Sequence, residues 1–84
     1  SNGALQINPR LAAAYNCIGL SYTQKKMYAE AVDAFKSALE INPNYADAHF
    51  GLGIAYESEG LVEEAKQAFE TFDKIKDKTT KPSH

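Results

Sequence analysis

The strongest constraint on the fold is an internal repeat with a period of 34 residues. When the sequence is shifted against itself by this period, residues 4–43 align with residues 38–77 without a gap, and 14 of the 40 aligned pairs are identical. For example, Ala-Leu-Gln-Ile-Asn-Pro at 4–9 returns as Ala-Leu-Glu-Ile-Asn-Pro at 38–43. In repeat architectures each unit cannot bury its own apolar faces and stacks on its neighbour. The chain is therefore expected to fold as a short stack of similar units.

The apolar residues within each unit recur with a helical period. A stripe at i, i+4, i+7 and i+11 runs from Leu11 to Tyr22 in the first unit and from Tyr45 to Tyr56 in the second. Such spacing places side chains on one face of an α-helix, and no segment of useful length alternates apolar and polar residues as a strand would. The predicted fold class is all-α, with four helices at 10–25, 28–41, 44–59 and 62–77.

Proline and glycine separate the predicted helices. Pro43 disfavours helical geometry in the residue before it, and Gly60 stands where a helix end needs a left-handed cap. Lys26 takes the place of Gly60 in the first unit, where a left-handed backbone would cost about 1 kcal/mol. The predicted organisation is a candidate cloning remnant plus the end of a preceding repeat at 1–9, one repeat at 10–43, a second at 44–77, and a flexible basic tail at 78–84.

The order of small and large residues resembles the tetratricopeptide repeat, a unit of two antiparallel helices. The signature residues are Tyr15, Ile18, Gly19, Tyr22, Ala31, Phe35, Ala38 and Pro43 in the first unit, and His49, Leu52, Gly53, Tyr56, Ala65 and Phe69 in the second. The resemblance covers residues 4–77 and implies a fragment of a right-handed superhelical solenoid of helix-turn-helix repeats. Small residues such as Gly19 and Gly53 would let the two helices of a unit approach closely.

The second unit departs from the family pattern near its end. Phe72 stands where the family has a small residue, and Asp77 stands where it has proline. We therefore expect the second unit to end the array or to continue its last helix. Arrays of this type need about three repeats for stability. Two units and a fraction leave apolar ends uncovered, so self-association through these ends is expected.

Members of this family bind partner peptides on a concave face lined by the first helix of each unit. By position, the resemblance implies nine partner-binding residues: Ala13, Asn16, Cys17, Leu20 and Gln24 in the first unit, and Asp47, Phe50, Ile54 and Glu57 in the second. Thr23, Gly51 and Ser58 complete the lining. The implied site is a groove for an extended or helical segment with apolar anchors and basic flanks. In the alternative interpretation, these side chains contact further repeats or a symmetry-related copy.

Charge and residue content exclude several functions. The chain has 9 basic and 11 acidic residues and a net charge of −2, which gives no general attraction to nucleic acid. No stretch approaches the roughly 20 apolar residues of a membrane span. Cys17 is the single cysteine and can form neither an internal disulfide nor a cysteine zinc cluster, and a free thiol favours the cytoplasm. Neither His49 nor His84 has a ligand-spaced neighbour, so no metal or cofactor is expected.

The leading functional hypothesis is a non-catalytic protein-protein interaction module that binds a peptide or partner segment in its concave groove. No residue set supports catalysis within this chain. The competing hypothesis is a scaffold or oligomerisation arm of a larger enzyme or assembly factor, and a catalytic domain flanking this segment would favour it.

Overall fold

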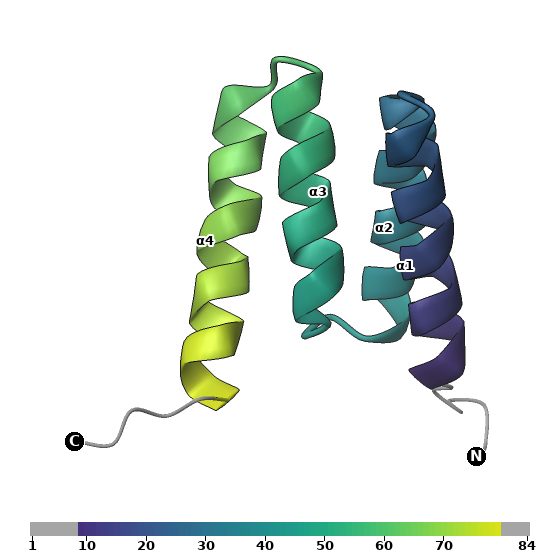
Figure 1. Cartoon of the computed structure of the whole chain (residues 1–84). Coiled ribbons are helices and arrows are strands. Elements are labelled where there is room, and N and C mark those ends of the chain that lie inside the picture. Colours follow the sequence, from purple (N-terminus) through teal and green to yellow (C-terminus); the bar gives the residue numbers. More distant parts are fainter. Residues whose placement is uncertain (1–8, 80–84) are drawn as a thin grey trace.

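A computed structural model describes residues 9–79 of the chain, which form four helices joined by short turns (Figure 1). The helices are α1 (Pro9–Gln24), α2 (Tyr28–Ile41), α3 (Ala46–Ser58) and α4 (Val62–Thr79). No strand occurs in the described part, and the predicted all-α fold of antiparallel helix-turn-helix repeats is confirmed. Helix α4 continues through Thr79, so the first two residues of the predicted tail are helical. The predicted end of a preceding repeat, at residues 4–7, lies outside the described residues.

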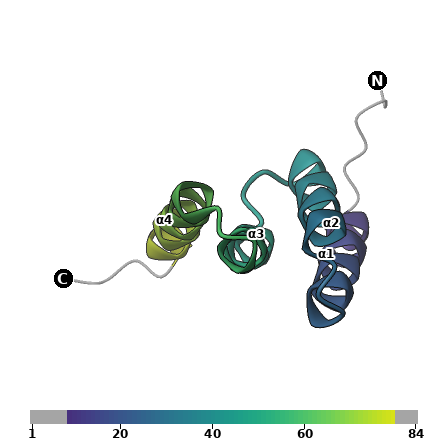
Figure 2. The ribbon, with the colours of Figure 1, turned by 90° about the horizontal axis from the view of Figure 1, so that it is seen from above.

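The helices form an open row and do not close into a bundle. Helix α3 lies in the middle, in contact with α1 and α2 on one side and with α4 on the other (Figures 1 and 2). Helix α4 contacts neither α1 nor α2. The molecule measures 39 × 38 × 18 Å and is thus less than two helix diameters thick. The row therefore has two ends, which we call the N-terminal face (the side of α1 that points away from α3) and the C-terminal face (the side of α4 that points away from α3).

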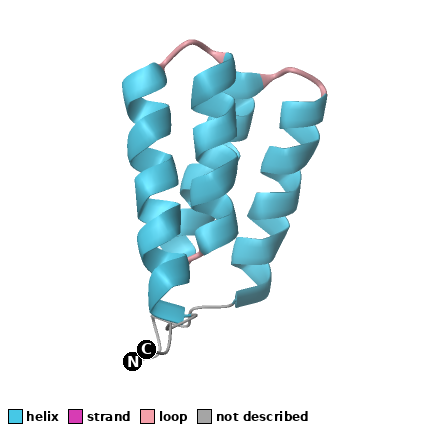
Figure 3. Ribbon diagram, turned by 60° about the vertical axis from the view of Figure 1, so that its left-hand side comes forward, coloured by secondary structure: helices cyan, strands magenta, loops and turns pink. Residues whose placement is uncertain are grey.

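The turns inside the two units lie at the same end of the molecule (Figure 3) and have the same backbone geometry. In the first unit Lys26 has φ +65°, and in the second Gly60 has φ +83°. The following residue donates its backbone N–H to the carbonyl five residues earlier, from Met27 to Tyr22 and from Leu61 to Tyr56, both at 2.8 Å. This is the Schellman arrangement, which satisfies the last carbonyls of a helix. Lys26 thus has the left-handed backbone whose cost the sequence raises as a question.

Hydrogen bonds between side chains and the backbone stabilise the turn between the two units. Asn42 accepts the backbone N–H of Asn44 on its Oδ1 at 3.1 Å, in a local turn typical of asparagine. His49 lies in the first turn of α3, with its Nε2 at 3.0 Å from the carbonyl oxygen of Pro43. An Nε2–H that donates to this carbonyl gives His49 a structural role at the position where the family pattern has a large aromatic residue.

The core is built around Phe35, whose side chain is fully buried. A Cβ atom placed on Gly19 would lie 2.6 Å from the Phe35 ring, and one placed on Gly51 would also overlap it. In the second unit a Cβ atom on Gly53 would overlap the ring of Phe69 in the same way. The predicted close approach of the two helices in each unit is therefore present. In addition, the ring of Phe35 packs against the backbone of α3 and joins the two units.

Candidate partner-binding surface

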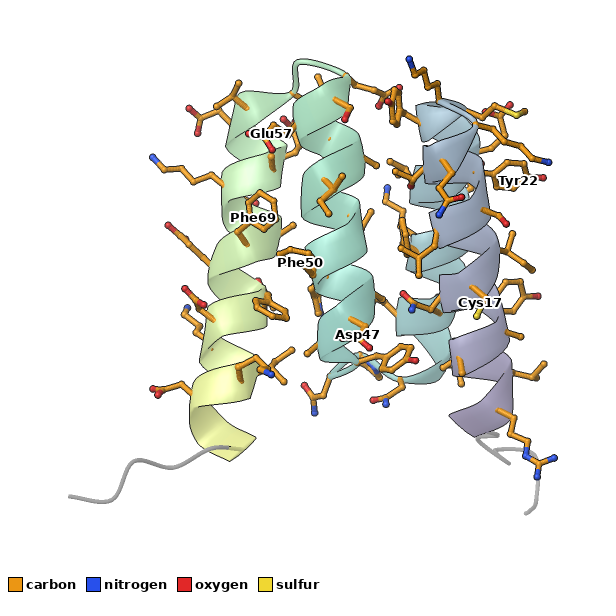
Figure 4. The ribbon with its side chains drawn as sticks, viewed as in Figure 1. Cys17, Tyr22, Asp47, Phe50, Glu57 and Phe69 are labelled. Atoms are coloured by element: carbon orange, nitrogen blue, oxygen red, sulfur yellow. The ribbon has the colours of Figure 1, made fainter. Side chains whose placement is uncertain are left out.

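Eight of the nine predicted partner-binding residues lie at the surface along α1 and α3. Those on α1 are exposed and those on α3 are exposed or, for Ile54, partly exposed. Their spacings of three and four residues place each set on one side of its helix. We call this the α1–α3 surface, and it consists of Ala13, Cys17, Leu20, Gln24, Asp47, Phe50, Ile54 and Glu57. Figure 4 shows Cys17 on α1, Asp47 at the start of α3, and Phe50 between α3 and α4.

The ninth residue, Asn16, is in the interior. It is only 7% exposed, and its buried Oδ1 has no hydrogen-bond partner within the described structure. Its repeat equivalent on α3 is Phe50, which is 44% exposed. The two positions differ in their neighbours, because α1 contacts both α2 and α3, whereas Phe50 lies against Phe69 and Phe72 of α4 at the end of the row. Gly51 is also buried, under the Phe35 ring, and does not line a surface.

An aromatic cluster borders the α1–α3 surface at α4. The ring centroid of Phe50 lies 5.6 Å from that of Phe69 and 5.0 Å from that of Phe72, with tilted planes. The ammonium of Lys76 lies 5.8 Å from the centroid of Phe72, within range of a cation–π contact. In the sequence, Phe72 stands out only as a departure from the family pattern, and this cluster was not predicted. A signal was present, since Phe72 and Phe69 are three residues apart and share a helix face.

The charges of the α1–α3 surface are negative. Asp47 and Glu57 flank the apolar residues Phe50 and Ile54 along α3, and the four residues on α1 are uncharged. Burial raises the pKa of Tyr45 above its ordinary value of 10.0, and the neighbouring acidic groups of Asp47 and Cys17 raise it further. The tyrosine therefore stays a neutral hydroxyl at physiological pH, and the surface offers carboxylates to a basic partner.

Two hollows in the molecular surface occupy equivalent places in the two units, away from the α1–α3 surface. The first has a volume of about 280 Å³ and is lined by Tyr15, Ile18, Tyr22, Glu30, Asp33, Ala34 and Ser37. The second has a volume of about 200 Å³ and is lined by His49, Leu52, Tyr56, Glu64, Gln67, Ala68 and Thr71. Each residue of the second set follows its counterpart by 34 positions. The hollow between the two helices of a unit is thus a repeated feature of the fold.

An open row of duplicated antiparallel helix pairs, with one stripe of side chains exposed on the first helix of each pair, defines a helical-repeat protein. A family model described as TPR repeat matches residues 19–60, and one described as tetratricopeptide repeat matches residues 46–79. The chain belongs to the tetratricopeptide repeat family.

Other comparisons gave no relative. No curated protein and no solved structure matches the chain. Among the described residues, no helix has the length and apolar character needed to cross a membrane.

Proposed function

We propose that this chain is a non-catalytic module that binds a segment of a partner protein on the α1–α3 surface. Tetratricopeptide repeats are generally protein-protein interaction modules, so a protein partner follows from the family. The observation that supports this particular surface is the exposure of large apolar side chains on it. Leu20 and Phe50 are each 44% exposed, although each is next to a buried glycine, Gly19 and Gly51 respectively. Exposed apolar side chains grouped on one surface mark interaction sites.

The charges of the surface indicate the partner's chemistry. Asp47 and Glu57 lie ten residues apart on α3, which is about 15 Å along a helix. Phe50 and Ile54 lie between them. A bound segment with apolar anchors in its middle and basic residues on either side would satisfy both features. Cytoplasmic location stays a prediction.

A second candidate function is that of a scaffold or oligomerisation arm, in which copies of the chain associate through uncovered repeat ends. The exposure of Leu11, Tyr15 and Ile18 on α1 favours it, because large apolar side chains are grouped there at helical spacing. Self-association and partner binding use different sides of α1, so one does not exclude the other.

Capture of partners tests the first proposal. Cellular proteins are captured on the immobilised wild-type chain and on a Leu20→Asp, Ile54→Asp double variant. Neither residue belongs to the Phe50 aromatic cluster, so the variant leaves that contact intact. Val62→Asp is the matched control, because Val62 is 64% exposed on α4 and does not belong to the α1–α3 surface.

The proposal predicts that specific partners are lost with the double variant and retained with the control, while far-UV circular dichroism shows all chains folded. Direct titration of a captured partner then gives its affinity. Equal capture by the wild type and the folded double variant would place binding elsewhere on the molecule.

A further inference from the structure

The N-terminal face is apolar, and none of the described residues, 9–79, covers it. Leu11, Tyr15 and Ile18 on α1 are 48%, 36% and 43% exposed. Their repeat equivalents are Tyr45, just before α3, and His49 and Leu52 on α3, which are partly or fully buried. Leu52 is in the same core cluster as Val32 of α2. Within one molecule, then, the same helix face is covered by a neighbouring helix in the second unit and uncovered in the first.

The C-terminal face does not offer the matching surface. In the first unit, Val32 and Leu39 of α2 belong to or pack against the core cluster that includes α3. Their equivalents on α4 are Lys66 and Asp73, and both are exposed. A second copy that stacked its α1 on α4, as α3 stacks on α2, would place apolar side chains against these charges. Burial of unpaired charges costs free energy, so head-to-tail stacking is disfavoured.

The close approach between units also cannot be repeated at the C-terminal face. The stacking of α3 on α2 requires that Gly51 has no side chain, because the ring of Phe35 occupies that space. In a head-to-tail stack the equivalent pair is Cys17 on the incoming α1 and Phe69 on α4. The side chain of Cys17 would overlap the ring. Overpacking of this kind destabilises well-packed contacts, so the head-to-tail arrangement is opposed sterically as well as electrostatically.

From these observations we infer that two copies of the chain pack through their N-terminal faces, with their α1 helices antiparallel, in a symmetric dimer. The inference rests on the proposed self-association and specifies the face, the symmetry and the size of the assembly. Each copy contributes the same exposed stripe of Leu11, Tyr15 and Ile18. A twofold interface uses one patch twice and closes at two copies, whereas head-to-tail contacts continue into filaments.

The charges at the N-terminal face fit the antiparallel arrangement. Glu30 and Asp33 line the first hollow together with Tyr22, near the end of α1. The start of α1 carries Arg10 and has no acidic residue in its first turn, and a helix start attracts negative charge. With antiparallel α1 helices, the start of one lies beside the end of the other. Arg10 of each copy is then near Glu30 and Asp33 of the other copy.

The dimer leaves the α1–α3 surface available. At 100° per residue, Leu11, Tyr15 and Ile18 lie on one side of α1, and Ala13, Cys17, Leu20 and Gln24 lie on another. Two partner-binding surfaces would therefore be displayed by one assembly. For a partner with two suitable segments, this doubles the contacts without any change in the individual site.

Sedimentation equilibrium of the 84-residue chain over a range of concentrations tests the inference. We expect a monomer–dimer equilibrium with no larger species. Ile18→Asp, and independently Leu11→Asp, should raise the dimer dissociation constant at least about tenfold. Val62→Asp, at an exposed site on α4, is the matched control and should leave it unchanged. Far-UV circular dichroism verifies that each variant is folded. If one of the two α1 variants does not fold, the other still tests the interface.

Charge exchange tests the antiparallel geometry. Arg10→Glu and the double variant Glu30→Arg, Asp33→Arg should each dimerise more weakly than the wild type, and an equimolar mixture of the two should form a heterodimer more tightly than either forms a homodimer. A mixture that shows no such gain contradicts the antiparallel pairing.

The remaining outcomes of sedimentation distinguish the symmetric dimer from self-association in general. A monomer at all concentrations overturns both. Species that grow beyond the dimer, or a dimer that is insensitive to Ile18→Asp and Leu11→Asp, would preserve self-association but overturn the symmetric interface through the N-terminal face.

Discussion

The ring of Phe35 lies against the backbone of Gly51 so closely that a Cβ atom on Gly51 would overlap it. Phe35 belongs to α2 and Gly51 to α3, so this contact joins the two repeats. The same ring packs against Gly19 of α1. One fully buried side chain thereby sets the spacing of three helices. The geometry between the units depends on the absence of a side chain at Gly51.

Gly51→Ala should therefore destabilise the protein. The Phe35 ring is enclosed and cannot yield without displacing its neighbours, and overpacking of a core costs about 1–3 kcal/mol. The gain in helix propensity from glycine to alanine, about 1 kcal/mol, offsets part of this cost. Urea unfolding followed by circular dichroism measures the difference. Cys17→Ala, at the equivalent exposed position of α1, is the control and should leave the unfolding free energy nearly unchanged. A Gly51→Ala protein more stable than the wild type would contradict the packing argument.

Lys26→Gly should stabilise the protein by about 1 kcal/mol. Lys26 has φ +65°, and a left-handed conformation costs a side-chain-bearing residue about 1–2 kcal/mol, whereas glycine adopts it freely. The second unit already has Gly60 in this place. Lys25→Gly, one residue earlier, is the control and should destabilise, because Lys25 has no positive φ to relieve. The midpoint of thermal unfolding measures both effects. A midpoint for Lys26→Gly below that of the wild type would contradict the argument that the backbone of Lys26 is strained.

Much of the fold was predictable because each sequence pattern occurs twice, once in each repeat. The Asn-Pro turn at 42–43 and the glycine cap at Gly60 end helices by local rules that need no tertiary information. The pairing of Gly19 with Phe35 follows from the family pattern. The contact of Phe35 with Gly51 was not predictable in this way, because it depends on how two units rotate against each other. The right-handed superhelical solenoid stays a prediction.

The partner-binding surface was predictable only in outline. The family resemblance, carried over by position, places Cys17, Leu20, Asp47 and Ile54 on the first helix of each unit, and they lie on α1 and α3. It cannot tell that Asn16 is covered while its equivalent Phe50 is exposed, because coverage depends on which neighbours a helix has in the row. The aromatic cluster was missed for a similar reason, since it joins α3 to α4 across a turn. Whether the surface binds a partner stays a prediction.

The pH dependence of stability should reveal the environment of Tyr45. Burial, reinforced by Asp47 and Cys17, raises the pKa of its hydroxyl in the folded state above the ordinary 10.0. The folded protein then holds this proton more tightly than the unfolded chain does. By linkage, the contribution of Tyr45 to stability is fully present below about pH 10 and is lost as the pH rises through the folded-state pKa.

Urea unfolding of the wild type and Tyr45→Phe between about pH 8 and 11 measures this contribution. The stability of the wild type should fall more steeply with pH than that of the variant, because phenylalanine does not ionise. Parallel curves for the two proteins would contradict the raised pKa. Other tyrosines and lysines titrate in this range in both proteins, so only the difference between the curves carries the result.

Ala38 and Phe72 occupy equivalent positions in the two repeats. Placing each side chain at the other position should destabilise the protein by different amounts. Ala38 is fully buried, so Ala38→Phe would force a ring into the packed core and should cost about 1–3 kcal/mol or more. Phe72 is only partly buried and contacts Phe50 and Lys76. Phe72→Ala should therefore cost about 1 kcal/mol, the typical worth of an aromatic pair.

The comparison of the two variants tests whether another chain covers Phe72 on α4 in solution. If α4 were covered in solution as α2 is, Phe72 would be enclosed, and its loss should cost the 3–5 kcal/mol of a buried phenylalanine. Denaturant unfolding of both variants at low and high protein concentration distinguishes the cases. A cost near 1 kcal/mol that is independent of protein concentration supports a Phe72 that no other chain covers, while a larger cost that grows with concentration would mean that another chain packs on it.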